Sequence, residues 1–149
     1  MKRFFLIATI LVFAAATAAL GVRAAGAPII VMAGQAKYGP APAPYPSQTS
    51  IAVLSGDPTA TGSQYAVRLK IPDGVKIAPH THGDTENVTV ISGTLMVGLG
   101  TTFDASHMLA LAAGSYVSVP AGTPHFAMAK GDTVVQVNGV GPASMTLVH

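Results

Sequence analysis

The chain has 149 residues, of which half are hydrophobic, and it contains no cysteine. This length indicates one domain, and without disulfides its stability must come from a hydrophobic core, from oligomerisation or from a bound metal ion. The formal net charge is +2, but three of the eight basic residues lie within the first 23 positions, and the others form no cluster with interleaved aromatic residues. The composition therefore argues against nucleic acid as a partner.

Residues 1–24 have the pattern of a secretory signal peptide. Lys2 and Arg3 precede an apolar run that carries no charge as far as Val22, and small residues up to Ala24 provide a cleavage site. We therefore expect an exported protein, either periplasmic or secreted. A run of this length also suits an uncleaved membrane anchor, and that alternative stays open. Cleavage would leave five bases against six acids, so the mature chain would carry a net charge of about −1.

Residues 25–49 are rich in proline and alanine, with the stretch "KYGPAPAPYPSQ" over residues 37–48. Repeated prolines remove backbone donors and favour an extended conformation, so this segment is predicted to be an arm and not a helix. Two uses are open. The arm is either a spacer from a membrane anchor or a segment laid over a neighbouring subunit.

Residues 50–149 are predicted to form an all-β domain, because short apolar or alternating runs are separated by turn residues. In one run, Val67, Leu69 and Ile71 alternate with Arg68 and Lys70, which is the period of a half-buried strand. Many short strands with regular turns indicate an antiparallel sandwich or barrel. The predicted strands or strand pairs lie in residues 51–58, 64–74, 86–100, 114–129 and 132–141.

Two local features are less regular. The tripeptide Ser92 to Thr94, "SGT", is a signal for a hairpin turn. Residues 103–114 have a weak helical pattern, in which Asp104 or Ser106 caps a single turn and Gly114 ends it.

Residues 80–86, "HTHGDTE", carry the strongest chemical signal in the chain. Residues at alternate positions of an extended strand share a face, so His80 and His82 can direct both imidazoles toward one point. Glu86 follows after a glycine that allows the chain to bend, and His125 follows the turn "PAGTP" of a second hairpin. Three imidazoles and one carboxylate suit a divalent transition metal such as Fe, Mn, Ni, Cu, Co or Zn.

The spacing of these residues resembles the two motifs of the cupin superfamily. The resemblance covers Ser50 to Val148 and is closest to small, single-domain, exported bacterial cupins. It implies an antiparallel jelly-roll β-barrel with an N-terminal arm, and one metal ion held by residues His80, His82, Glu86 and His125. One position departs from the pattern, because Ala129 stands where the second motif usually ends in asparagine. The matching positions are Gly74, His80, His82, Glu86 and Gly93 in the first motif, and Gly114, Pro120, Gly122 and His125 in the second.

Other polar residues have two interpretations each. Asp84 either accepts a hydrogen bond from the N–H of a ligand imidazole or is a solvated turn residue. Tyr116 either contacts a substrate or packs as an amphipathic side chain. His107 and His149 match no motif position and are predicted to be surface residues. Met96, Met108, Met128 and Met145 either line a substrate pocket or fill the core.

Two classes of function follow from a metal with open coordination positions. The first is an exported metal-dependent enzyme, similar to a dioxygenase or an isomerase, that acts on a small oxygen-rich organic compound. In this hypothesis Glu86 has a dual role as metal ligand and general base. The second is a non-catalytic ligand-binding or sensor module. The resemblance to cupins also implies a homodimer.

Overall fold

The computed structural model describes residues 26–148, so the predicted signal peptide and His149 lie outside the described residues. In residues 26–148 no helix is long and apolar enough to cross a membrane. The regular structure of these residues consists of β-strands and one three-residue 3-10 helix, Ala105–His107. The strands are β1 (Gly39–Pro40), β2 (Ser50–Ser55), β3 (Gln64–Ile71), β4 (Lys76–Thr81), β5 (Glu86–Leu99), β6 (Leu109–Ala112), β7 (Tyr116–Val119), β8 (His125–Val140) and β9 (Thr146–Leu147).

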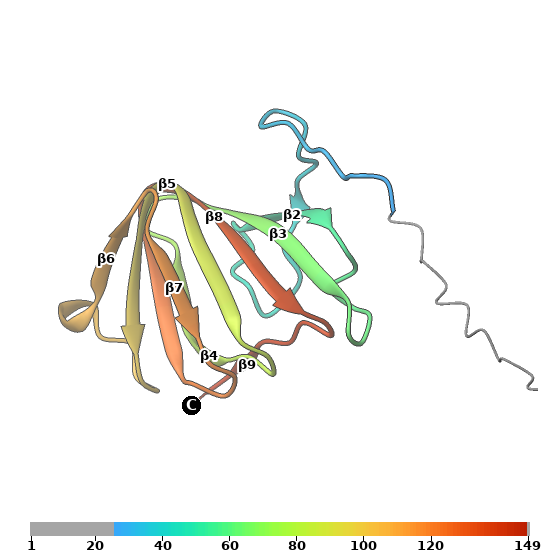
Figure 1. The fold of residues 1–149 in the computed structure, drawn as a ribbon. Helices are drawn as coiled ribbons and strands as arrows, with labels where there is room; N and C mark the ends of the chain where they lie inside the picture. Colours follow the sequence, from blue (N-terminus) through green and yellow to red (C-terminus); the bar gives the residue numbers. More distant parts are fainter. Residues whose placement is uncertain (1–25, 149) are drawn as a thin grey trace, which may run out of the picture.

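The two longest strands, β5 and β8, organise the fold. They pair antiparallel over almost their whole length, and the register shifts between Val90 and Thr94. Both strands turn over at this point, which is the apex between the two limbs of the molecule in Figure 1. Each strand therefore contributes one half to each of two facing layers.

The shorter strands add to the two layers in order. One layer holds β2 and β3 beside the second half of β8, and the first half of β5 beside β7. The other holds β9 and β4 beside the first half of β8, and the second half of β5 beside β6. All pairings are antiparallel, and the prediction of an antiparallel jelly roll is confirmed.

The predicted hairpin turn at residues 92–94 is wrong, because β5 continues through it. Gly93 has a φ of 76°. A side chain there would lie 2.4 Å from the carbonyl oxygen of Asp132 in β8. Glycine therefore serves the bend of a continuous strand, where its positive φ and its lack of a Cβ atom are both needed.

Residues 103–114 are helical only at their start. Asp104 caps the 3-10 helix by accepting from the backbone N–H of Ser106 at 2.9 Å, as the sequence indicated. The chain then becomes extended, because residues Leu109–Ala112 pair with β5. The predicted helical character of this second part is wrong, since strand pairing overrides a weak local preference.

The core lies between the two layers and is formed mainly by aliphatic side chains. The alternation predicted for β3 is confirmed, because Val67, Leu69 and Ile71 are buried while Lys70 is exposed. Phe126, at the start of β8, is the largest fully buried side chain among the described residues. Its ring packs so closely against Gly98 that a side chain at position 98 would clash with it. Ala129, which stands where the second motif usually has asparagine, is also buried in this core.

The proline-rich arm lies on the barrel of its own chain. Strand β1 pairs with Ser50 and Ile51 of β2, and the Lys70 ammonium lies 4.0 Å from the centre of the Tyr38 ring. Thr49 is fully buried, and Tyr45 packs against the core cluster. This part of the arm is therefore a wall of the domain.

Candidate metal centre

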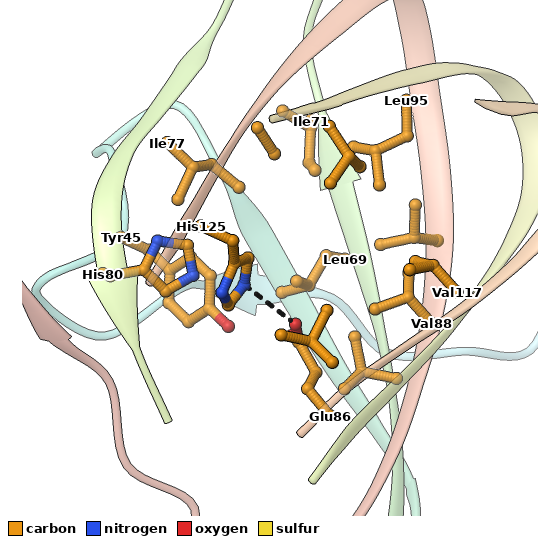
Figure 2. A pocket seen from close by; sticks show the side chains of 15 residues that line it. Tyr45, Leu69, Ile71, Ile77, His80, Glu86, Val88, Leu95, Val117 and His125 are labelled. Atoms are coloured by element: carbon orange, nitrogen blue, oxygen red, sulfur yellow. Dashed lines mark ion pairs between the residues drawn. The ribbon is translucent and has the colours of Figure 1, made fainter. Parts of the chain in front are cut away.

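The four predicted site residues lie at the ends of strands far from the apex. His80 is in β4, His82 follows it, and Glu86 and His125 are the first residues of β5 and β8. Because Glu86 belongs to one layer and His80 and His125 to the other, the group spans the open end between the layers. Figure 2 shows His80, His125 and Glu86 pointing into the same cavity.

Strand pairing explains how the histidines meet. His80 and His125 are register partners in the antiparallel pair β4–β8, and their ring centres are 4.2 Å apart. His82, two residues beyond His80, has its ring centre 4.8 Å from that of His80. The prediction that these two side chains share a face is confirmed. The ligand atoms of His80, His82 and His125 all lie within 4.8 Å of one another.

Each of the three imidazoles is oriented by a backbone carbonyl. The Nδ1 atom of His80 lies 2.7 Å from the Ala78 oxygen, and that of His125 lies 3.0 Å from the Thr123 oxygen. The Nδ1 atom of His82 lies 2.7 Å from the oxygen of Ser144. A carbonyl oxygen can only accept, so each Nδ1 donates its hydrogen. In the neutral rings the lone pair is then on Nε2, which is the usual arrangement of a metal-ligating histidine.

The Nε2 atoms of His82 and His125 face a carboxylate and not a donor. Oε2 of Glu86 lies 3.3 Å from Nε2 of His125 and 3.5 Å from Nε2 of His82. Nε2 of His82 is buried and has no hydrogen-bond partner. Two acceptors at these separations repel unless a proton or a cation lies between them, and a buried unsatisfied nitrogen is costly. The donor set therefore fits a metal ion.

Burial and the carboxylate act differently on the three groups. Burial, with the neighbouring imidazoles, lowers the pKa of His80 to about 4, although the Ala78 carbonyl opposes this. Burial also acts to lower the pKa of His125, but the Glu86 carboxylate and the Thr123 carbonyl raise it overall. The pKa of Glu86 is lowered, because the imidazoles outweigh the effect of its burial. The cluster thus favours a carboxylate beside a neutral His80.

Two cavities adjoin the cluster. The inner one, of about 40 Å³, has His80, His125 and Glu86 at one end and aliphatic side chains of the core, such as Leu69 and Val88, beyond them (Figure 2). The outer one, of about 240 Å³, includes His82 and opens toward the arm. Tyr45, Glu86 and Val137 line both cavities.

Two residues discussed from the sequence have other partners. Asp84 does not bind a ligand imidazole; its Oδ2 accepts from the backbone N–H of Val140 at 2.7 Å and so holds the loop between β4 and β5. Tyr116 is exposed, and its hydroxyl donates to Oδ1 of Asn87 at 2.7 Å. Among the four methionines considered, Met145 lines the outer cavity and also packs against the core cluster.

Two residues at the site were missed by sequence reasoning. Tyr45 comes from the arm, and Ser144 from the segment before β9. The Oγ atom of Ser144 also accepts from the backbone N–H of Gly83 at 2.9 Å. Neither residue belongs to a motif, and the only signal for them is the tertiary fold.

The fold and the histidine cluster together define a class of jelly-roll protein with a candidate metal site. Residues 67–140 match the family model of the cupin domain. The chain belongs to the cupin superfamily, and the resemblance seen in its sequence is confirmed. No curated protein matches the sequence significantly.

Solved structures share the fold at low sequence identity. The polyketide cyclase RemF from Streptomyces resistomycificus superposes with a TM-score of 0.66 at 17% identity, over 80% of this chain and 84% of the cyclase chain. A candidate acetylacetone dioxygenase from Methylibium petroleiphilum gives 0.65 at 17% identity, over 84% and 85% of the chains. The DMSP lyase DddQ from Ruegeria pomeroyi gives 0.58 at 19% identity, over 75% and 60%.

Proposed function

We propose that this cupin is an exported metal-dependent enzyme, similar to a dioxygenase or an isomerase, that acts on a small organic compound bearing oxygen. One divalent transition metal, Fe, Mn, Ni, Cu, Co or Zn, would be held by His80, His82, His125 and Glu86. Export is proposed from the signal-peptide pattern of residues 1–24.

The observation that carries the proposal is the orientation of the imidazoles. Three Nδ1–H groups donate to backbone carbonyls, which leaves the Nε2 lone pairs for a ligand, and the ligand atoms of the three imidazoles lie within 4.8 Å of one another. Two of the Nε2 atoms also lie beside the Glu86 carboxylate. A protein that used these residues only to hold a turn would pair the buried Nε2 atom of His82, which has no partner.

A bound metal of this kind would supply Lewis acidity and, if it is redox-active, a site for oxygen chemistry. The residues of the chain do the rest. Glu86 carries negative charge into a largely apolar cavity and, in a dual role, would both hold the metal and accept a substrate proton. The aliphatic side chains beyond the cluster give the inner cavity a mainly apolar lining, in which the charge of Glu86 is weakly screened.

The substrate class is proposed from the cavities and from the structural neighbours. The neighbours include a polyketide cyclase, a candidate acetylacetone dioxygenase and a DMSP lyase. The outer cavity, at about 240 Å³, lies just below the roughly 300–1,000 Å³ typical of drug-sized ligands, which favours a small molecule.

The first test is elemental analysis of the mature protein, purified without added metal or histidine-tag chromatography. We expect about one equivalent of a transition metal, and a protein that neither contains nor takes up metal would contradict the proposal. The metal-loaded protein is then assayed with chelating diols and diketones for oxygen uptake and products. Metal binding without turnover would favour the alternative of a ligand-binding or sensor module.

A further inference from the structure

The arm brings a tyrosine to the boundary between the two cavities. Tyr45 lines both of them, together with Glu86 and Val137. Figure 2 shows the hydroxyl oxygen of Tyr45 directed into the cavity that His80, His125 and Glu86 also line. A ligand that extended from the outer cavity toward His80 and His125 would lie beside this side chain.

The position of Tyr45 is fixed before any ligand arrives. Its backbone N–H donates to the Pro42 carbonyl at 3.1 Å, and its ring packs against the core cluster. On either side, β1 is paired with β2 and Thr49 is fully buried. A preorganised side chain loses little conformational entropy on binding, so its hydrogen bond contributes more to affinity.

The hydroxyl of Tyr45 is available for a ligand. Within residues 26–148 it has no hydrogen-bond partner, whereas the exposed hydroxyl of Tyr116 donates to Asn87. Tyrosine hydroxyls in half-buried sites usually find a partner. Burial, with the charge of Glu86, also raises the pKa of Tyr45, so the hydroxyl keeps its proton and can donate.

The remaining lining of the outer cavity indicates what the ligand looks like. Near the arm and β3 the walls are mainly apolar or aromatic, and the polar groups gather where the cavity meets the cluster. The apolar part includes Pro42, Pro44, Ile51, Pro58, Tyr65 and Met145, and the polar part includes His82, Asp84 and Glu86. Such a cavity suits a compound with an apolar body and oxygen at one end.

We propose that Tyr45 is a specificity-determining residue that donates a hydrogen bond from its phenol to an oxygen of such a compound, while the apolar body lies against the arm. This inference rests on the proposed function for the site. It adds the arm as a part of the binding site and narrows the substrate to a small, mainly apolar compound with oxygen at one end.

The test compares two variants that each lose one phenol hydroxyl. Tyr45→Phe removes the proposed donor, and Tyr116→Phe removes an exposed hydroxyl from a residue that lines neither cavity. The probe is acetylacetone, a small compound with two oxygens, titrated calorimetrically into cobalt-loaded protein. We expect Tyr45→Phe to weaken binding about three- to tenfold, as the loss of one hydrogen bond implies, and Tyr116→Phe to change it less than twofold.

The outcomes separate this inference from the proposed function. Cobalt content and melting temperature are measured first, and both variants should match the wild type. A Tyr45→Phe protein that binds acetylacetone as tightly as the wild type, or a wild type that does not bind it, overturns the role of Tyr45 whether or not metal is present. A wild type that takes up no cobalt overturns the proposed function. The calorimetric comparison of wild type and Tyr45→Phe without metal still shows whether Tyr45 contacts the compound.

Discussion

The chain places histidine beside a carboxylate in two regions, and the closer pair is not the site. On the surface, Nδ1 of His107 lies 2.6 Å from Oδ2 of Asp104, and the two side chains are 82% and 47% exposed. At the cluster, Nε2 of His125 lies 3.3 Å from Glu86, and the side chains are 5% and 13% exposed. The histidine–carboxylate distance alone would therefore select the surface pair as the candidate metal site.

The two pairs differ in which ring nitrogen faces the carboxylate and in how far solvent reaches them. The Nδ1 atom of His107 contacts the carboxylate of Asp104, which caps the start of a 3-10 helix. Water screens this exposed pair, so its contribution to stability is small. His125 uses Nδ1 for the Thr123 carbonyl and turns Nε2 inward. When Nδ1 of a histidine donates to a backbone carbonyl, the ring is held with Nε2 directed toward a ligand. A metal site requires this orientation.

The largest predicted effect separates these two regions directly. His125→Ala should lower metal affinity by more than about a hundredfold, because removing even a supporting group costs 10–100-fold. At a metal concentration about a hundred times the wild-type Kd, the variant also loses most of the roughly 2.7 kcal/mol by which the metal stabilises the wild type. Metal analysis and melting curves with and without metal would measure both.

The matched control for that variant is His107→Ala. It removes the shorter of the two histidine–carboxylate contacts, and metal content and melting temperature should stay close to wild type. Full metal content in the His125→Ala protein would show that the cluster is not the metal site.

A second prediction uses the lowered pKa of His80. The unfolded chain protonates this imidazole near pH 6.5, and the folded protein only near pH 4. Stability is therefore present above pH 6.5 and is lost as the pH falls toward 4, by up to about 3 kcal/mol in the metal-free protein. Denaturant unfolding of wild type and His80→Gln across this window would measure the difference.

The comparison with the variant is needed because the pKa of His125 changes stability with pH in the opposite direction. Its pKa is raised, so its contribution is present at low pH and is lost as the pH rises through the folded pKa. Replacing His80 should flatten the acid loss, and His107→Gln should leave it unchanged. An equal acid loss in wild type and His80→Gln would show that burial of His80 does not control it.

The smallest predicted effect concerns the loop that holds His82. Ser144→Ala removes the hydroxyl that accepts from the N–H of Gly83 at 2.9 Å but keeps the carbonyl that binds His82. Metal affinity should fall by about tenfold or less. Ser106→Ala also removes a hydroxyl that contacts a carboxylate, on the surface, and should leave affinity unchanged. Equal metal affinities for both variants would show that this loop does not contribute to metal binding.

The sequence predicted the cluster because its information is local. His80, His82 and Glu86 lie within seven residues, and strand parity is enough to place the first two on one face. His125 follows a turn rich in glycine and proline, which restricts the direction of the chain. The alternating pattern of β3 was also readable, since period two is a property of the strand itself.

The remaining features depend on contacts between distant segments. Tyr45 is 35 residues before His80, and Ser144 is 62 residues after His82, so no spacing rule connects them to the cluster. Gly93 was interpreted as a turn because a positive φ serves a hairpin and a bent strand equally well. Asp84 had two plausible interpretations until the fold brought Val140 to it.

The carbonyl of Ser144 also sets an order of events during synthesis. A chain made from its N-terminus presents His80, His82 and Glu86 before residue 144 exists, since synthesis adds about 5–20 residues per second. Until that carbonyl arrives, the imidazole of His82 lacks the acceptor that selects its tautomer. The ligand set of the proposed metal ion is therefore complete only after the segment that precedes β9 has been added.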